Sequence, residues 1–327
     1  MKPFEHVNPA NEKEAVAALS PMYEKSLPIG GGQDLLARMK DYITQPDRLV
    51  NVKNLDATVA RLNGGLRIGS AMKMVDVAEH PEIARLYPAV SAAAIEVGTP
   101  QIRNQGTVGG NINQRPRCWY FRNEEFVCYK KGGNRCFSPS GENQFHAILG
   151  GGPTYIVHPS SLAVPFVAYD ATFRLLGPRG ERMVKAADYF TMPTRENVER
   201  ENVLEPNELL THVILPAPGS VKTGHYEVRY KAAHDWPIAF ATVILAMSGS
   251  TVQNARVVMG AVAPVPWRSK EAEAALAGKK VTPETAVAAA DAALAKAEPL
   301  SRNAYKVQVA KTAVERAILK AAGLPIA

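Results

Sequence analysis

Two glycine-rich segments, far apart in the chain, limit most strongly how it can fold. Glycine lets a backbone approach a phosphate closely, and successive N–H groups in such a turn attract anions. Neither segment has the spacing of a P-loop or of the dinucleotide fingerprint. The pair predicts a pyrophosphate held between two parts of the chain, with a tight structural turn as the alternative for each segment. The segments are Ile29-Gly30-Gly31-Gly32-Gln33-Asp34-Leu35 and residues 102–113, Ile-Arg-Asn-Gln-Gly-Thr-Val-Gly-Gly-Asn-Ile-Asn.

The three cysteines of this 327-residue chain, Cys118, Cys128 and Cys136, directly follow the second segment. An odd, small number of cysteines does not make a disulfide framework, whereas clustered thiolates bind soft metal centres such as iron–sulfur clusters. We expect the basic residues around them to lower the thiol pKa values and to offset the charge of a cluster. Three buried thiols without metal are the alternative. The basic residues are Arg117, Arg122, Lys130, Lys131 and Arg135.

The order of expected elements indicates an α+β protein in three parts. Residues 1–57 alternate short strands and helices, residues 58–218 form a larger α/β unit, and residues 219–327 contain strands followed by helices. We therefore expect two N-terminal α/β subdomains followed by a C-terminal antiparallel sheet with helices. The strands expected after the cysteines cover residues 155–158, 171–176, 209–215, 226–231, 241–248 and 255–263.

Composition excludes several other classes of protein. The net charge is +7, but the basic residues are scattered and form no run typical of nucleic-acid binding, so we expect no nucleic-acid partner. No stretch approaches the roughly 18 apolar residues of a membrane span, and the first residues do not resemble a signal peptide. We expect a cytoplasmic protein, or a periplasmic one that is exported together with a partner.

Four blocks of sequence resemble the FAD-binding subunit of the molybdenum hydroxylases, the family of xanthine dehydrogenase and carbon monoxide dehydrogenase. The resemblance covers nearly the whole chain and implies that FAD lies between the two N-terminal subdomains. It also implies that both glycine-rich segments surround the FAD pyrophosphate and ribityl group, through Ile29 to Leu35 and through Thr107, Gly110 and Asn111. The blocks are residues 28–36, 102–111, 158–161 and 263–268.

Two further positions follow from the same resemblance. The stretch Arg229-Tyr230-Lys231 is similar to one near the flavin, which makes Lys231 a candidate cofactor-binding residue, with a surface lysine as the alternative. The block at His158 to Ser161 passes near the flavin in the family. The aspartate usual in that block is Ser161 in this chain.

The cysteines resemble an insertion, at about residues 115–154, found in flavin subunits of bacterial aldehyde oxidoreductases. That insertion carries a [4Fe-4S] cluster on four cysteines, the fourth directly after a Gly-Gly-Gly-Pro stretch. The corresponding residue after Gly150-Gly151-Gly152-Pro153 is Thr154. The resemblance therefore implies a [4Fe-4S] or incomplete cluster on Cys118, Cys128 and Cys136, with Thr154, His146 or His158 as candidates for the fourth ligand.

The function implied is electron transfer within a heteromeric molybdenum-dependent, aldehyde-oxidising enzyme. Its partners would be a large molybdopterin-binding subunit, a small [2Fe-2S] subunit and an external electron acceptor. No catalytic side chain is expected, since FAD carries the redox chemistry. One alternative is a non-catalytic iron–sulfur scaffold that has lost flavin. Another is a self-sufficient FAD oxidase, for which the chain offers no substrate domain of adequate length.

Overall fold

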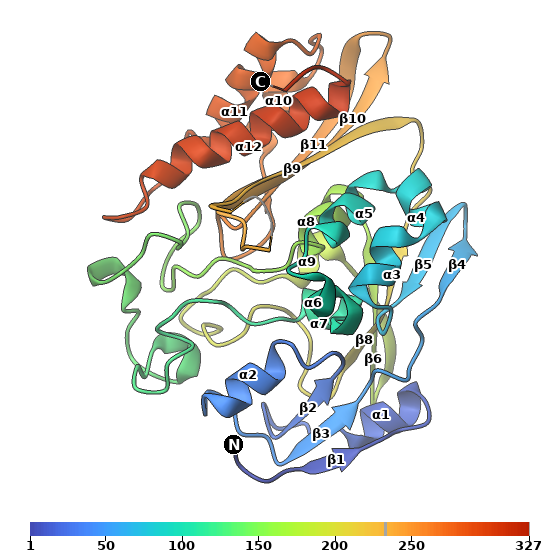
Figure 1. Ribbon diagram of the computed structural model, residues 1–327, viewed down its shortest axis with the longest axis vertical. Helices are drawn as coiled ribbons and strands as arrows, with labels where there is room; N and C mark the ends of the chain where they lie inside the picture. The colour runs from blue at the N-terminus through green and yellow to red at the C-terminus, as the bar shows by residue number, and fades with distance from the viewer. Residues whose placement is uncertain (232–233, 327) are drawn as a thin grey trace.

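Three β-sheets follow one another along the chain, each built from a separate stretch of sequence (Figure 1). The computed structural model describes residues 1–231 and 234–326. Helices and strands are mixed throughout, and the last sheet is antiparallel with helices packed on it, so the expected fold class is confirmed. None of the described helices has both the length and the apolar character needed to cross a bilayer.

The first sheet is parallel and has the order β1-β3-β2. Parallel neighbours need crossover connections, and helices follow both β1 and β2. The first glycine-rich turn connects the end of β2 to the start of α2, which places it at the carboxyl edge of the sheet. The elements are β1 (Glu5–Val7), α1 (Glu12–Ala18), β2 (Ser26–Ile29), α2 (Leu35–Lys40) and β3 (Arg48–Asn51).

The second sheet is wholly antiparallel and has the order β4-β5-β8-β6-β7. Its helices lie mostly between β5 and β6 in the sequence, and two of them, α6 and α7, are formed by the second glycine-rich segment. The elements are β4 (Val59–Leu62), β5 (Gly65–Gly69), α3 (Met74–Glu79), α4 (Pro81–Leu86), α5 (Pro88–Ile95), α6 (Pro100–Gln105), α7 (Val108–Ile112), α8 (Ala163–Ala168), β6 (Thr172–Gly177), β7 (Gly180–Lys185), α9 (Ala186–Tyr189) and β8 (Leu209–Leu215).

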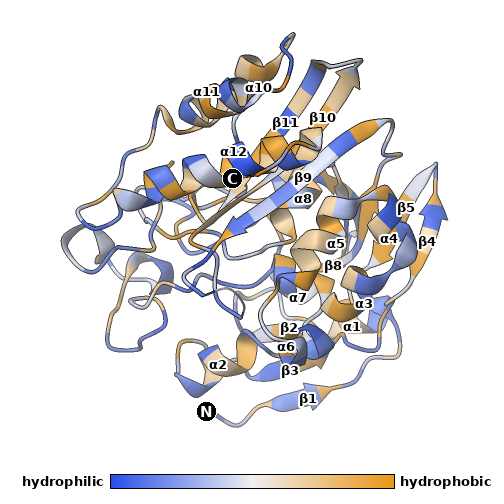
Figure 2. Ribbon diagram, turned by 45° about the horizontal axis from the view of Figure 1, so that its top comes forward, coloured by the Kyte–Doolittle hydropathy of each residue, from blue (hydrophilic) through white to orange (hydrophobic). Residues whose placement is uncertain are grey.

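The third sheet, of order β12-β11-β10-β9, is buried on both faces. Along β10, Ala241 and Val243 belong to the core beneath the C-terminal helices, whereas Phe240 and Ile244 belong to the core of the second unit. Hydrophobic residues of β10 therefore lie on both faces of the sheet, and Figure 2 colours much of this strand as hydrophobic. The elements are β9 (Val221–Val228), β10 (Ala239–Ser248), β11 (Thr251–Gly260), β12 (Trp267–Arg268), α10 (Lys270–Leu276), α11 (Pro283–Leu294) and α12 (Tyr305–Ala322).

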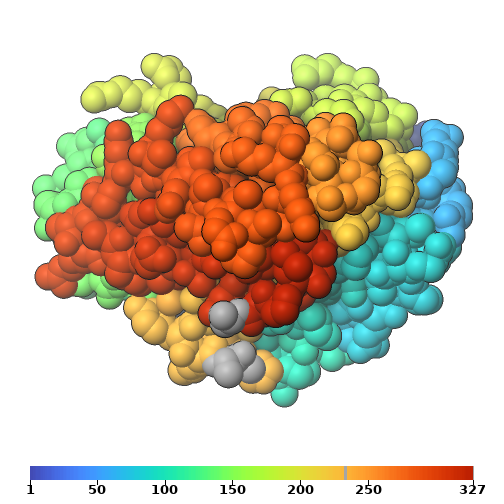
Figure 3. All heavy atoms as spheres, turned by 90° about the horizontal axis from the view of Figure 1, so that it is seen from above, coloured from blue at the N-terminus to red at the C-terminus, as the bar shows by residue number. Residues whose placement is uncertain are grey.

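The cysteine-bearing stretch between α7 and α8 contains two short 3-10 helices, η1 (Tyr129–Lys131) and η2 (Ser138–Ser140), and no strand. The strand expected at residues 155–158 was wrong. The backbone there pairs with a loop, because the His158 N–H donates to the Ala263 carbonyl at 3.0 Å. The cysteine-bearing stretch lies at one side of the molecule, next to the C-terminal helices (green in Figures 1 and 3).

Candidate functional site

A cavity of about 480 Å³ lies where the three parts of the chain meet. Its lining comes from the first glycine turn, from the second glycine segment and the loop before β8, and from residues 234–237 ahead of β10. This volume is within the range of small-molecule and cofactor sites, which occur preferentially between domains. All seven residues from Ile29 to Leu35, together with Thr107, Gly110 and Asn111, line the cavity, so the structure brings ten of the predicted site residues together.

The first glycine turn presents unused hydrogen-bond donors to this cavity. No described backbone carbonyl accepts a hydrogen bond from the N–H groups of residues 30–35. Most of these residues are partly exposed, so a ligand can reach them, and a run of N–H groups in a turn is a preformed anion site. The turn therefore fits the pyrophosphate of a dinucleotide.

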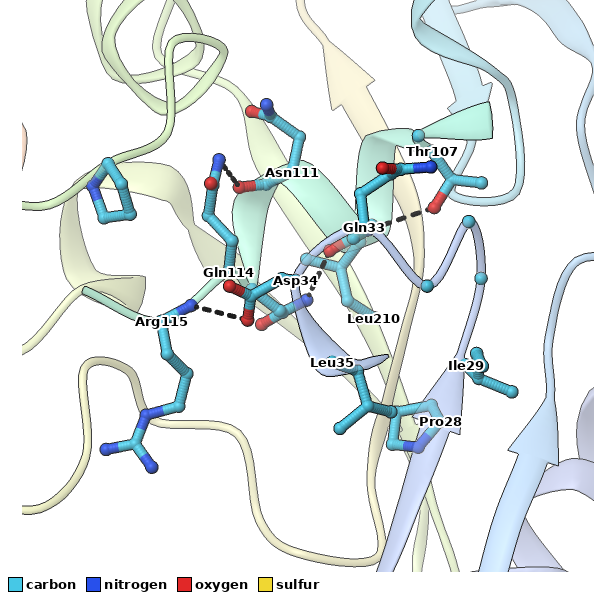
Figure 4. Close-up of a pocket in the computed structure, with 18 of the residues that line it drawn as sticks. Pro28, Ile29, Gln33, Asp34, Leu35, Thr107, Asn111, Gln114, Arg115 and Leu210 are labelled. Carbon is cyan, nitrogen blue, oxygen red and sulfur yellow. Dashed lines mark hydrogen bonds between the residues drawn. The ribbon is translucent and has the colours of Figure 1, made fainter. Parts of the chain in front are cut away.

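Close packing is a second reason why this turn contains glycines. A Cβ atom at Gly31 would lie 2.0 Å from the Gln105 carbonyl oxygen, and one at Gly30 would lie 2.7 Å from Thr107 Oγ1. The two glycine-rich segments pack directly against each other, as Thr107 above the turn in Figure 4 shows. The turn is therefore both a tight structural turn and a candidate pyrophosphate site. Gly30 and Gly31 permit the close packing, and their N–H groups remain free to bind an anion.

The second glycine-rich segment differs from the first, because its backbone N–H groups already donate hydrogen bonds within the protein. Thr107 Oγ1 accepts from the Gly110 N–H at 3.1 Å, which caps α7. The Asn111 Oδ1 atom accepts from Ser160 Oγ at 2.7 Å. Thr107 and Asn111 thus shape the cavity wall through bonds within the protein, whereas a Cβ at Gly110 would meet only Thr107 Oγ1, at 3.1 Å.

Asp34, at the end of the first turn, is held by arginines from the cysteine-bearing stretch. Its Oδ1 atom lies 2.5 Å from Arg122 Nη2 and 3.1 Å from Arg117 Nη1. Its Oδ2 atom accepts a hydrogen bond from the Arg115 N–H at 3.2 Å (Figure 4). Burial alone would raise the pKa of Asp34, but these arginine charges and that of Arg38 outweigh it and hold the pKa below its usual value. Asp34 is therefore an anionic anchor of the turn.

A second buried carboxylate extends this network of ion pairs. Glu201 pairs with Arg115 at 2.9 Å and with Lys130 at 2.8 Å, and Arg115 also pairs with Glu24 at 3.0 Å. Burial would raise the pKa of Glu201, but Arg115 and Lys130 lower it below the usual value. No local sequence pattern indicates this network of ion pairs, because its members come from four separate stretches of the chain.

Lys231 lies on the surface and is not among the described residues that line the cavity. The expected strand over residues 226–231 ends at Val228. Its near neighbours Asp235 and Trp236 do line the cavity, and so does Ser161 at the position where the family has an aspartate. Asp235 and Trp236 were missed because their stretch shows no periodic pattern.

The three cysteines are free thiols within one loop region. The Cys118 Sγ atom lies 3.2 Å from His146 Nε2, and the Cys136 Sγ atom lies 3.4 Å from Ser138 Oγ. Among the described residues, no three His, Cys, Asp or Glu side chains are placed to hold a single metal ion. The ligands of a cluster with several irons lie farther apart than the ligands of one ion. The observed placement therefore argues against a site for a single metal ion and leaves a cluster open.

The expectation that basic neighbours lower the thiol pKa values was wrong. Burial raises the pKa of Cys118 to about 11, and burial also raises that of Cys128. Three of the nearby cations have other partners, since Arg117 and Arg122 pair with Asp34 and Lys130 pairs with Glu201. Lys131 does lower the pKa of Cys128, but burial outweighs it. The Cys118 pKa is raised further by the charges of Cys128 and Cys136, so the three thiols lie in one neighbourhood.

An open row of backbone donors beside a cavity of this size is typical of a protein that binds a phosphate-bearing cofactor, and comparison with known families specifies which one. Residues 2–218 match the FAD binding domain in molybdopterin dehydrogenase, and residues 224–321 match the CO dehydrogenase flavoprotein C-terminal domain. The chain therefore belongs to the family of FAD-binding medium subunits of molybdenum hydroxylase-type oxidoreductases.

Individual relatives agree with this assignment. The aldehyde oxidoreductase FAD-binding subunit PaoB of Escherichia coli is 33% identical over 298 residues, covering 90% of each chain. The carbon monoxide dehydrogenase medium chain of Hydrogenophaga pseudoflava is 29% identical and covers 96% of each chain. A solved structure of carbon monoxide dehydrogenase from the same organism superposes with a TM-score of 0.77 at 28% identity, covering 98% of this chain and 97% of the other.

Proposed function

We propose that this chain is the FAD-carrying electron-transfer subunit of a heteromeric, molybdenum-dependent aldehyde oxidoreductase. The observation that carries the proposal is the open row of N–H groups at residues 30–35, which faces a cavity of suitable size. These groups would hold the pyrophosphate, while Ile29, Leu35 and Thr107 form walls of the cavity. Bound FAD would accept electrons that arrive from [2Fe-2S] centres of a partner and release them to an external acceptor.

The same observation favours this function over a scaffold that has lost flavin. A purely structural subunit has no use for a row of six open backbone N–H groups beside a cavity, whereas an anionic cofactor does. The partners proposed are a large molybdopterin-binding subunit and a small [2Fe-2S] subunit, in keeping with the relatedness to aldehyde oxidoreductase and carbon monoxide dehydrogenase subunits. The division into residues 1–57, 58–218 and 219–327 is part of this proposal.

Co-expression with the proposed large and small partner subunits, followed by anaerobic addition of an aromatic or aliphatic aldehyde, tests the function. Flavin absorbance near its visible maximum should bleach with aldehyde and return on adding an acceptor. A complex that contains flavin and molybdenum but whose flavin does not bleach with any aldehyde tested would contradict an aldehyde-oxidising role.

We further infer that Cys118, Cys128 and Cys136 hold an iron–sulfur cluster, [4Fe-4S] or incomplete. Two observations favour it: the three thiols share one neighbourhood, and the buried Thr154 carries an Oγ1 atom without a hydrogen-bond partner among the described residues. Iron and acid-labile sulfide analysis of anaerobically purified protein tests this inference. A content near zero, together with full flavin, would remove the cluster and leave the flavin function intact.

A further inference from the structure

The ion pairs that surround Asp34 and Glu201 form one connected, largely buried network with an excess of positive charge. The exposed fraction of its side chains is 3% at Lys130, 7% at Glu201 and 15% at Asp34. Five cations and three carboxylates belong to it, so each cation has a carboxylate partner but the network carries a net charge of +2. Its members are Arg38, Arg115, Arg117, Arg122 and Lys130 with Glu24, Asp34 and Glu201.

Buried charge is costly unless it is balanced, so a net charge of +2 in a largely buried network favours an anionic ligand beside it. The network lies beside the open N–H groups of residues 30–35, because Asp34 itself ends that turn. The pyrophosphate of FAD carries two negative charges. Its charge therefore matches the excess in the network.

Arg117 is the member of the network best placed to meet such an anion. Its Nη1 atom lies 3.1 Å from Asp34 Oδ1 and its Nη2 atom donates to Gln114 Oε1 at 2.8 Å, while the guanidinium group stacks on the ring of Trp236 at 4.8 Å. The Nε atom is buried and has no hydrogen-bond partner among the described residues. Both Arg117 and Trp236 line the cavity.

These contacts fix the side chain while leaving a donor unused. Asp34 orients the guanidinium group from the glycine turn, and Trp236 supports it from the stretch ahead of β10. A planar guanidinium group held in this way is well suited to a phosphate, to which it makes strong charge-assisted hydrogen bonds. The immediate neighbour of Arg117 is Cys118, whose carbonyl accepts from the Arg122 N–H at 2.9 Å.

We propose that Arg117 is a further ligand of the FAD pyrophosphate, positioned by Asp34 and Trp236, so that residues 115–122 form a third wall of the flavin site. The cysteine-bearing stretch then serves the flavin directly, whether or not its thiols hold a cluster. This inference rests on the proposed function, since it adds a residue to the site that would hold FAD.

The test is equilibrium binding of FAD, ADP and riboflavin to the purified, flavin-free full chain. Arg117→Gln should weaken FAD and ADP binding by the same factor, about tenfold to a hundredfold, as expected for the loss of a hydrogen bond to a charged group. Riboflavin has no phosphate, so its binding should not change. Arg117→Lys keeps the charge but loses the planar fork and should give an intermediate loss for FAD and ADP.

Arg302→Gln is the matched control, because Arg302 forms an exposed ion pair with Glu142 at the edge of the same stretch and is absent from the cavity lining. It should bind FAD like the wild type. The proposal is overturned if Arg117→Gln binds FAD within twofold of the wild type, or if Arg117→Gln does not fold and Arg117→Lys binds FAD and ADP like the wild type. A wild-type chain that binds no FAD would instead contradict the proposed function.

Discussion

Replacing Gly31 by alanine tests the idea that the two glycine-rich segments form the flavin site by packing directly on each other. The new Cβ atom would lie 2.0 Å from the Gln105 carbonyl oxygen and 2.9 Å from Gly106 Cα, both of them backbone atoms. Ordinary contact begins near 3.4 Å, so the segments would have to separate by about 1.4 Å. Gly31 does not have a positive φ angle, so the backbone itself accepts alanine and the effect is purely one of packing.

Overpacking of this kind costs about 1–3 kcal/mol of folding stability. A shift of more than 1 Å also moves the open N–H groups out of hydrogen-bonding range of a pyrophosphate, so FAD affinity should fall by at least about tenfold, or about 1.4 kcal/mol. Urea unfolding of the flavin-free chain measures the first quantity, and FAD titration followed by flavin fluorescence measures the second.

Gly106→Ala is the control within the same pair of segments. Its Cβ would approach nothing closer than 3.2 Å, the Ile102 carbonyl oxygen, so a movement of a few tenths of an ångström accommodates it. Its effect on stability and on FAD affinity should be clearly smaller. The reasoning would be refuted if Gly31→Ala matched the wild type in both measurements, or if both alanine variants had equal effects.

Three further changes test other parts of the structure. Lys306→Met should lower the free energy of unfolding by about 3 kcal/mol. The buried Nζ atom donates to the carbonyls of Phe145, His146 and Ala261, and the variant leaves these acceptors unsatisfied. A loss below about 0.5 kcal/mol in urea unfolding would contradict this role of Lys306. Asp34→Asn should cost about 3 kcal/mol near neutral pH, and because the pKa of Asp34 is held below its usual value, the stabilisation it gives is present above about pH 4 and lost as the pH falls through the folded-state pKa. The difference between wild type and Asp34→Asn should therefore shrink in unfolding experiments below pH 4, and a constant difference would contradict the ion-pair assignment. Thr154→Cys should raise the iron and sulfide content per chain if this buried position faces a three-cysteine cluster, and an unchanged content would place the fourth ligand elsewhere.

Many helices and strands of the fold could be predicted from the sequence, because local patterns of residues determine them. The helices expected after the strands of residues 219–327 are observed as α10, α11 and α12, and the strand expected over residues 209–215 is observed as β8. Residues 155–158 are the opposite case. They have an apolar strand-like composition, yet tertiary packing pairs them with a loop near Ala263.

Only part of the candidate site could be predicted from the sequence, because the rest depends on contacts between distant residues. Glycine-rich turns carry their chemistry in the local backbone, so residues 29–35 and Thr107, Gly110 and Asn111 could be predicted as candidates from the sequence. The contact between Asp34 and Arg122 spans 88 positions and depends on the packing of an irregular stretch, which no periodicity describes. The thiol pKa expectation failed for the same reason, since nearness in sequence did not show that the cations pair with carboxylates.

The most direct test of the account is the FAD stoichiometry of the purified chain, measured from its visible absorbance after release of the flavin by denaturation. We expect close to one FAD per chain in the wild type after reconstitution and a strong reduction in Gly31→Ala. A folded wild-type chain that retains no flavin in excess FAD would contradict the central claim, whatever its iron content.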